Sequence, residues 1–127
     1  RQMCIRDSFD TVMPGLSIFD FGDGVRSSCT TENAIDIEKY RYYCRGYFEN
    51  MRCEDKENYF LGIVCIAGEL ACRYLYDVLS GENYFSAKTD EQKLARYCSL
   101  RKFVVSVVEN RKAIDNITAE YEKAAFL

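Results

Sequence analysis

The stretch YFLGIVCIAGELACRYLYDVL, Tyr59–Leu79, decides the fold, because it is apolar on nearly every side when it is wound into a helix. A helix that is apolar all round belongs in the centre of its protein. We predict a helix from Glu54 to Ser80, with Asp55 as its N-terminal cap and Gly81 as its stop. The sequence therefore predicts a helical bundle built around this segment.

A charged pair and two glycines interrupt this apolar segment. Glu69 and Arg73 are four residues apart, so they share one face of the helix. Two interpretations stay open: a structural ion pair near the helix surface, or a pocket wall on which Arg73 offers its donors to a polar ligand. Gly62 and Gly68 each lower helix stability by about 1 kcal/mol relative to alanine. We expect them to permit the close approach of a neighbouring backbone.

Helical periodicity continues on both sides of the central segment. Apolar residues recur every three to four positions from Ile37 to Met51, and a helical period returns from about Thr89 to Ala125. Residues Phe9–Thr31 are rich in Gly, Asp and Ser, which predicts an irregular arm with one short helical turn around 19–26. No segment alternates as a β-strand does. We therefore expect a mainly α fold with three main helices and an irregular N-terminal arm.

The first eight residues, RQMCIRDS, differ from the rest of the chain because they show neither periodicity nor capping residues. They resemble the translation of sequencing-adapter DNA. Residues 1–8 are therefore interpreted as a foreign leader and set apart from the fold. The remaining residues, 9–127, fit one ordinary domain or part of one.

Composition narrows the classes of function. The net charge is −3 at pH 7 and 48% of the residues are hydrophobic, which is usual for a folded soluble chain and gives no basic surface for nucleic acid. No signal peptide is recognised and charge breaks the longest apolar run, so we expect a cytoplasmic protein without a membrane partner. The chain has no histidine, and therefore no Ser–His or Cys–His nucleophile of its own.

Seven cysteines are spread along the chain, and no two of them form a C-x-x-C pair. A structural zinc site usually combines closely spaced cysteines, or cysteine with histidine. Cys65 and Cys72 stand among apolar residues, in IVCIAG and ELACRYL. We therefore expect the cysteines to be small core residues in a reducing compartment rather than metal ligands.

Two blocks of sequence carry a resemblance to a known family. The first is DTVMPG at 10–15 with FDFGD at 19–23 and Arg26, and the second is ELACRYLYDVLSGENYF at 69–85. In this order, the blocks resemble the aminoglycoside phosphotransferase superfamily, and most closely its N-acetylhexosamine 1-kinase branch. The resemblance implies that the chain is the helical C-terminal part of a protein-kinase-like C-lobe, whose partner is a missing N-terminal lobe.

The resemblance also assigns roles to residues. It implies that the acceptor sugar is bound by four residues: Asp10, Thr11, Arg73 and Tyr84. Their chemistry suits a polyhydroxylated ligand, because a hydroxyl, a guanidinium and a phenol all form oriented hydrogen bonds. Other interpretations stay open, with Tyr84 as packing at a helix end, Thr11 as a turn residue and Asp10 as a cap.

Supporting roles fall to four charged residues: Asp20, Asp23, Arg26 and Glu69. The resemblance makes Asp20 a buried carboxylate that braces the catalytic loop by accepting backbone hydrogen bonds. Glu69 is expected to hold the Arg73 guanidinium by a bidentate pair.

ATP and Mg²⁺ belong to the intact parent enzyme that the resemblance implies. The family's metal-binding aspartate falls at Ser8, and its histidine–aspartate catalytic loop belongs upstream of this sequence. Phosphoryl transfer depends on positioning and charge neutralisation by those groups. We therefore expect no catalytic residue and no metal ligand in this chain, and no activity when it is tested alone.

Two departures leave the identity of the acceptor open. The segment after Arg26 is shorter than in the branch, and the chain has no tryptophan to stack on a sugar. A different class of function also stays open, namely a non-catalytic helical interaction or regulatory module. The run YRYYCRGY, residues 40–47, supports that alternative, because aromatic residues are enriched at protein interfaces.

Overall fold

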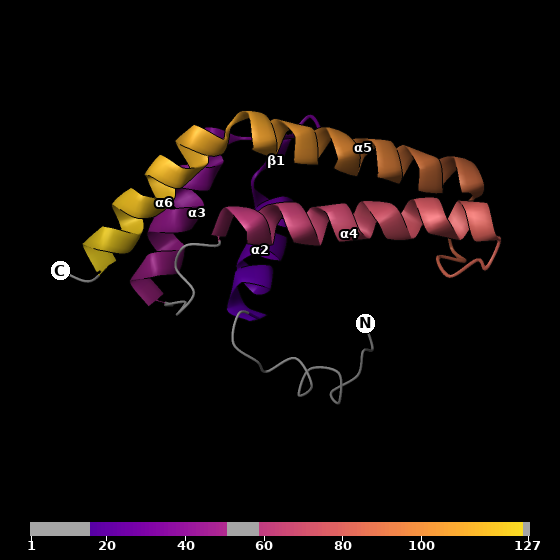
Figure 1. Ribbon diagram of the computed structural model, residues 1–127, viewed down its shortest axis with the longest axis horizontal. Helices are drawn as coiled ribbons and strands as arrows, with labels where there is room; N and C mark the ends of the chain where they lie inside the picture. Colours follow the sequence, from indigo (N-terminus) through magenta and orange to yellow (C-terminus); the bar gives the residue numbers. More distant parts are fainter. Residues whose placement is uncertain (1–15, 51–58, 126–127) are drawn as a thin grey trace.

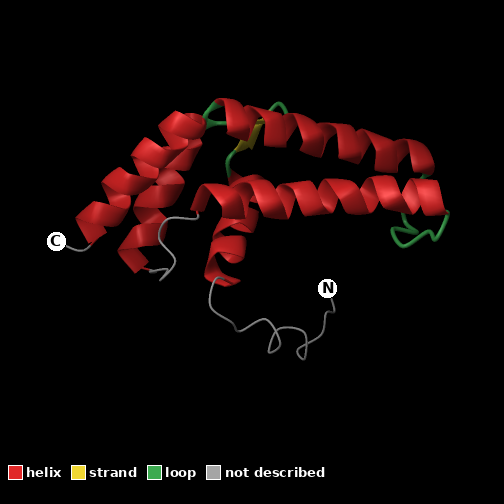
Figure 2. Cartoon of the chain, in the orientation of Figure 1, coloured by secondary structure: helices red, strands yellow, loops and turns green. Residues whose placement is uncertain are grey.

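The computed structural model describes residues 16–50 and 59–125 (Figure 1). Along the chain it contains α2 (Leu16–Ser28), β1 (Thr30–Thr31), β2 (Ala34–Ile35), α3 (Ile37–Asn50), α4 (Tyr59–Ser80), α5 (Asp90–Glu109) and α6 (Arg111–Ala125). The mainly α fold is confirmed for this part of the chain, with five helices and one small hairpin (Figure 2). The predicted leader, the start of the arm at Phe9 and the cap at Asp55 lie outside the described residues.

The two longest helices, α4 and α5, pack along each other, and α2 packs across the N-terminal half of α4 (Figure 1). At the other end α3 packs against α6. The main core joins all five helices and includes Phe21, Tyr40, Ile63, Phe103 and Ile114, each at most 2% exposed. The helix predicted to be central is therefore central, because it contacts both α5 and α2.

Helix α2 corrects the predicted irregular arm, because residues 16–28 form thirteen residues of helix rather than one turn. Its buried side chains, Ile18, Phe21 and Val25, recur every three to four residues and face the core. A Cβ on Gly22 would collide with the carbonyl of Gly62, and a Cβ on Gly62 would collide with that of Ile18. Burial of one apolar stripe and a close backbone contact thus outweigh a loop-like composition.

The β1–β2 hairpin was not predicted. Thr30 pairs with Ile35 and Thr31 with Ala34, and the turn residues Glu32 and Asn33 have φ of 52° and 66°. Positive φ at both central residues is the geometry of a two-residue hairpin turn. Strands of two residues are too short for an alternating pattern to appear in the sequence.

The predicted helix from Thr89 to Ala125 is two helices that meet at Asn110. Thr89 caps α5 through a capping box with Gln92, and Asn110 ends it with a backbone N–H that donates to Ser106 O at 3.0 Å. No glycine or proline marks the break. The helical period therefore continues across it, and the sequence predicts a single helix. The break turns α6 toward α3, where the Tyr40 hydroxyl lies 2.6 Å from Thr118 Oγ1.

The prediction that the cysteines are core residues is correct for Cys29 and Cys44 and wrong for Cys65, Cys72 and Cys98, which are exposed. Desolvation raises the pKa of Cys29 and of Cys44 to about 12, which keeps both thiols neutral. Cys65 and Cys72 are exposed because one face of α4 has no neighbour among the described residues. By length and composition α4 could cross a membrane, a test that the core helix of a soluble protein also passes.

Candidate functional site

The C-terminal end of α4 carries the candidate site. Gly81 has φ of 74°, and its N–H donates to Asp77 O at 3.1 Å, so the predicted helix stop is confirmed. A left-handed residue at this position is the usual end of an α-helix. The chain then forms the loop 81–88 before α5 begins at Asp90.

A buried carboxylate fastens this loop to α4. Asp77 is 2% exposed. Its Oδ1 accepts the N–H of Tyr84 at 2.6 Å, and its Oδ2 accepts the N–H of Phe85 at 3.0 Å. The Phe85 ring stacks on Tyr74 of α4 at 4.1 Å between centroids. The backbone of Tyr84 is therefore held next to the C-terminal end of α4 by its hydrogen bond to Asp77.

Lys93 of α5 completes the attachment. Its Nζ lies 2.9 Å from Asp77 Oδ2 and donates to Asn83 Oδ1 at 3.1 Å, and both charged side chains are 2% exposed. We call Asp77, Asn83 and Lys93 the clasp. Desolvation raises the pKa of Asp77, but the hydrogen bonds from Phe85, Lys93 and Tyr84 outweigh it and lower that pKa below its usual value. A buried pair satisfied on both sides holds α4, the loop and α5 together.

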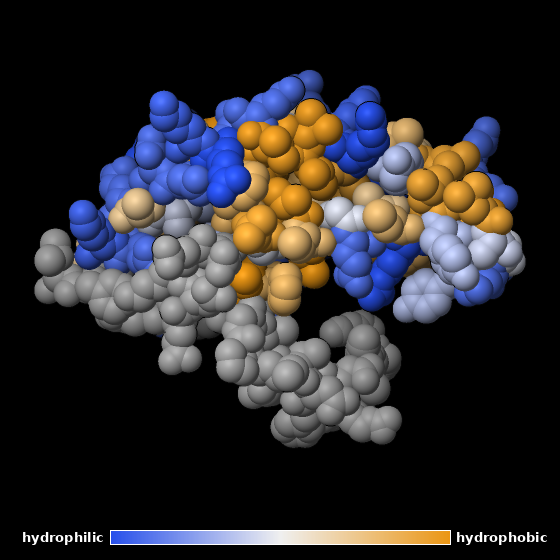
Figure 3. Space-filling view, viewed as in Figure 1, coloured by the Kyte–Doolittle hydropathy of each residue, from blue (hydrophilic) through white to orange (hydrophobic). Residues whose placement is uncertain are grey.

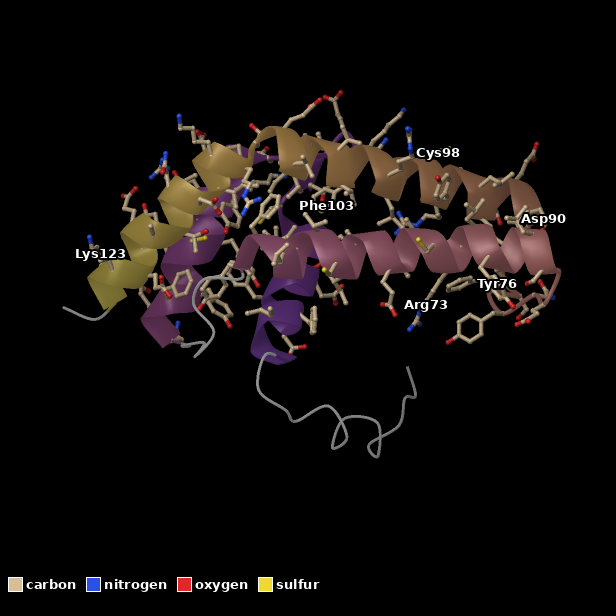
Figure 4. All side chains as sticks on the ribbon, in the orientation of Figure 1. Arg73, Tyr76, Asp90, Cys98, Phe103 and Lys123 are labelled. Carbon is tan, nitrogen blue, oxygen red and sulfur yellow. The ribbon has the colours of Figure 1, made fainter. Side chains whose placement is uncertain are left out.

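Beside the clasp lies a surface cavity of about 260 Å³, lined by Arg73, Tyr76, Asp77, Glu82 and Tyr84. We call it the Arg73 cavity. Arg73 and Tyr76 leave α4 on the side opposite α5 (Figure 4). Arg73 and Tyr84, two of the residues assigned by resemblance, thus line one cavity, although eleven positions separate them.

The Arg73 guanidinium has one carboxylate partner in the part of the chain that the structure describes. Its Nη2 donates to Glu69 Oε2 at 2.9 Å, and both side chains are more than half exposed. The expected bidentate pair is wrong, because a single nitrogen makes this contact. Arg73 thus forms a surface ion pair with Glu69 and also lines a cavity, and the binding of a polar ligand there stays a prediction. Among residues 16–50 and 59–125, no hydrogen bond or ion pair engages the remaining donors of Arg73.

The opposite wall of the cavity is polar and aromatic. The Tyr76 hydroxyl donates to Glu82 Oε2 at 3.0 Å, and this hydrogen bond raises the pKa of Tyr76. Tyr76 and Tyr84 are 59% and 71% exposed, so their rings stand at the rim. The cavity therefore offers guanidinium donors, a carboxylate acceptor and two aromatic faces.

The other residues assigned by resemblance lie away from this cavity or outside the described part. Asp23 and Arg26 form an ion pair on α2 at 2.9 Å. Asp20 is exposed on α2 among the described residues, and its role as a brace for the upstream catalytic loop stays a prediction. Asp10, Thr11 and Ser8 lie outside the described residues, so their predicted roles stay predictions.

Sequence reasoning missed four residues of the site: Tyr76, Asp77, Glu82 and Lys93. Tyr76 and Asp77 follow Arg73 by three and four positions, a spacing that places them near it on the helix. Lys93 begins the buried stripe of α5 that continues through Leu100, Phe103 and Val107. A lysine on an otherwise apolar stripe was the available signal for a buried ion pair.

The cavity does not fit a magnesium ion. Among residues 16–50 and 59–125, no group of three Cys, Asp or Glu side chains could hold a metal. The Asp77 carboxylate is occupied by two N–H groups and Lys93, and Glu82 accepts from Tyr76. No known protein-family model matches the chain.

Proposed function

We propose that this chain is the acceptor-binding, helical C-terminal part of an ATP-dependent small-molecule kinase, and that the Arg73 cavity binds a sugar of the N-acetylhexosamine class. One observation carries the proposal. Arg73 and Tyr84, assigned to sugar binding by resemblance, line the same cavity. A concave surface with a few convergent polar groups is the usual form of a small-molecule site.

The chemistry of the cavity supports a polyhydroxylated ligand. The free donors of Arg73 would reach sugar oxygens, and Glu82 would accept from a hydroxyl. The rings of Tyr76 and Tyr84 offer apolar area to the faces of a sugar ring. At about 260 Å³ the cavity is slightly smaller than the range of about 300–1,000 Å³ for drug-sized ligands. A monosaccharide is the size of ligand that it would hold.

The clasp would act in binding by positioning. It holds the backbone of Tyr84, a residue that lines the cavity together with Arg73, before a ligand arrives. A site whose parts are already in place loses less entropy when it binds. This chain's part in the reaction would be to orient the acceptor, whereas the transferred phosphate would come from ATP held by the missing lobe.

The proposal is tested by activity with and without the upstream lobe. We expect no magnesium-dependent phosphorylation of N-acetylglucosamine by the chain alone, since Ser8 stands where the family has its metal-binding aspartate. The natural coding sequence upstream of Phe9 should encode the histidine–aspartate catalytic loop, and the extended protein should turn over. Turnover by the chain alone, or an upstream frame without this loop, would refute the proposal.

The second candidate, a non-catalytic interaction module, rests on exposed apolar residues. Leu61 and Leu79 on α4 are 46% and 76% exposed, and Figure 3 shows apolar surface along the middle of the molecule. The tyrosine-rich run 40–47 supports it less than expected. Tyr40 is fully buried, and the Tyr43 hydroxyl donates to Phe21 O at 3.2 Å. These tyrosines build the core, and of the four only Tyr42 is classed as exposed.

A further inference from the structure

A second, smaller cavity lies between the C-terminal end of α2, the β1–β2 hairpin and the middle of α5. Its volume is about 50 Å³. Its polar lining comes from three elements and consists of Arg26, Thr30, Asn33, Arg96 and Ser99. Leu100 and Phe103, both buried, supply its apolar wall. It shares no lining residue with the Arg73 cavity.

Two arginines from different helices, Arg26 and Arg96, line this cavity. Arg26 is held in place because its Nε and Nη2 both donate to Asp23 Oδ1, at 3.1 and 2.9 Å. Arg96 lies over the Tyr74 ring at 5.7 Å and has no carboxylate partner in the part of the chain that the structure describes. Within the described ranges, the single carboxylate of Asp23 leaves one positive charge of this pair uncompensated. An anion between the two groups would relieve their repulsion.

Unused hydrogen-bonding groups surround the same space. Within the described ranges, no hydrogen bond engages the Ser99 hydroxyl or the Asn33 side-chain amide. The Thr30 hydroxyl donates to Arg26 O at 2.7 Å, so it shapes the wall rather than offering its hydrogen. Asn33 is presented by the hairpin turn, which Ile35 ties to α5 through an N–H that donates to Ser106 Oγ at 2.9 Å. The backbone that carries Asn33 is therefore held next to α5.

We propose that this cavity is a binding site for one tetrahedral oxyanion, either a free phosphate or the terminal phosphoryl group of a small ester. Planar guanidinium groups match the oxygens of phosphate, and the Ser99 and Asn33 donors add uncharged hydrogen bonds. A cavity of about 50 Å³ has room for one such group and excludes a nucleotide base. The site does not depend on sugar binding at the Arg73 cavity.

The test is a titration of the isotopically labelled chain with sodium phosphate at constant ionic strength, followed by NMR. We expect saturable shifts at the Ser99 and Asn33 amides and at the side-chain N–H of Arg96. Arg96→Gln should weaken binding about tenfold, since it removes one charge-assisted contact. Arg101→Gln is the matched control, because Arg101 is exposed on the same helix and does not line the cavity.

Two further variants and a second ligand test the same site. Arg26→Gln should weaken phosphate binding as Arg96→Gln does, which guards against a local effect of losing the contact with Tyr74. Arg73→Ala should leave phosphate binding unchanged, so a failed sugar site and a failed phosphate site are distinguishable. Methyl phosphate that binds as tightly as phosphate would identify an ester as the ligand, and weaker binding would identify the free ion. Binding of neither, or an equal loss in Arg101→Gln and Arg96→Gln, would overturn the proposal.

Discussion

The two faces of α4 differ in what they contact. The inner face, with Gly62, Ile63 and Asp77, is buried against α2, the loop 81–88 and α5. The exposed side of α4, which we call the outer face, carries Cys65, and the exposed Arg73 lies at its border with the inner face, one turn before Asp77. Each side of the helix contributes to one ion pair. The side chains of the inner pair, Asp77 and Lys93, are 2% exposed, whereas those of the outer pair, Glu69 and Arg73, are more than half exposed. The inner pair therefore maintains the structure, and the outer pair is available to a ligand.

The largest expected effect comes from the inner pair. Asp77→Ala leaves the Lys93 charge buried without its partner and removes the acceptor for two backbone N–H groups. We expect the thermal midpoint to fall by on the order of 10 °C. Glu69→Ala is the matched control on the outer face and should lower it by at most about 2 °C. Thermal unfolding followed by circular dichroism measures both midpoints. An equal decrease in the two variants would show that the clasp does not stabilise the fold.

The two glycines of α4 provide a smaller contrast of opposite sign. Gly62→Ala forces a Cβ against the Ile18 carbonyl, so we expect the free energy of unfolding to fall by about 1–3 kcal/mol. A Cβ on Gly68 meets nothing within 4 Å. Gly68→Ala should raise stability by about 0.5–1 kcal/mol, because alanine favours the helix. Denaturant unfolding measures both changes, and a loss in both variants would contradict the open outer face.

The stabilisation from the inner pair should decrease as the pH falls. The pKa of Asp77 is lower in the folded chain than its ordinary value of 3.8. The stabilisation is therefore complete above that ordinary pKa, and it is lost as the pH falls through the lower, folded pKa. We expect Asp77→Asn to remove this part of the acid sensitivity. Melting midpoints recorded from pH 6 to about pH 2 measure it, and an identical pH dependence in wild type and Asp77→Asn would refute it.

Hydrophobic periodicity predicted the helices around Ile37 and Tyr59 and the stop at Gly81, because these signals are local. It missed α2, whose burial depends on the distant Gly62, and the break at Asn110, which no glycine or proline marks. It also treated α4 as apolar on every side, although the residues that the structure describes cover only one of its faces. Cys44 is buried and Cys65 is exposed because of contacts with residues that are remote in sequence, which periodicity does not reveal.

The candidate site was predicted in part for the same reason. Arg73 and Tyr84 were named through the resemblance, and a turn after Gly81 was enough to expect them on one side of the helix. The clasp was not predicted, since Lys93 belongs to another helix and only the three-dimensional packing places it beside Asp77. Interactions within one helix and its adjacent loop were visible in the sequence, whereas those between α4 and α5 were not.

The central claim, that the outer face of α4 binds a sugar through Arg73, is tested most directly by titrating the chain with N-acetylglucosamine. Wild type is compared with Arg73→Ala and with Arg45→Ala, whose guanidinium is 4.0 Å from Glu49 in an exposed pair on α3, away from the cavity. We predict saturable binding that Arg73→Ala weakens at least about tenfold and Arg45→Ala leaves unchanged. Equal binding in all three proteins, or no saturable binding by the wild type, would contradict the claim.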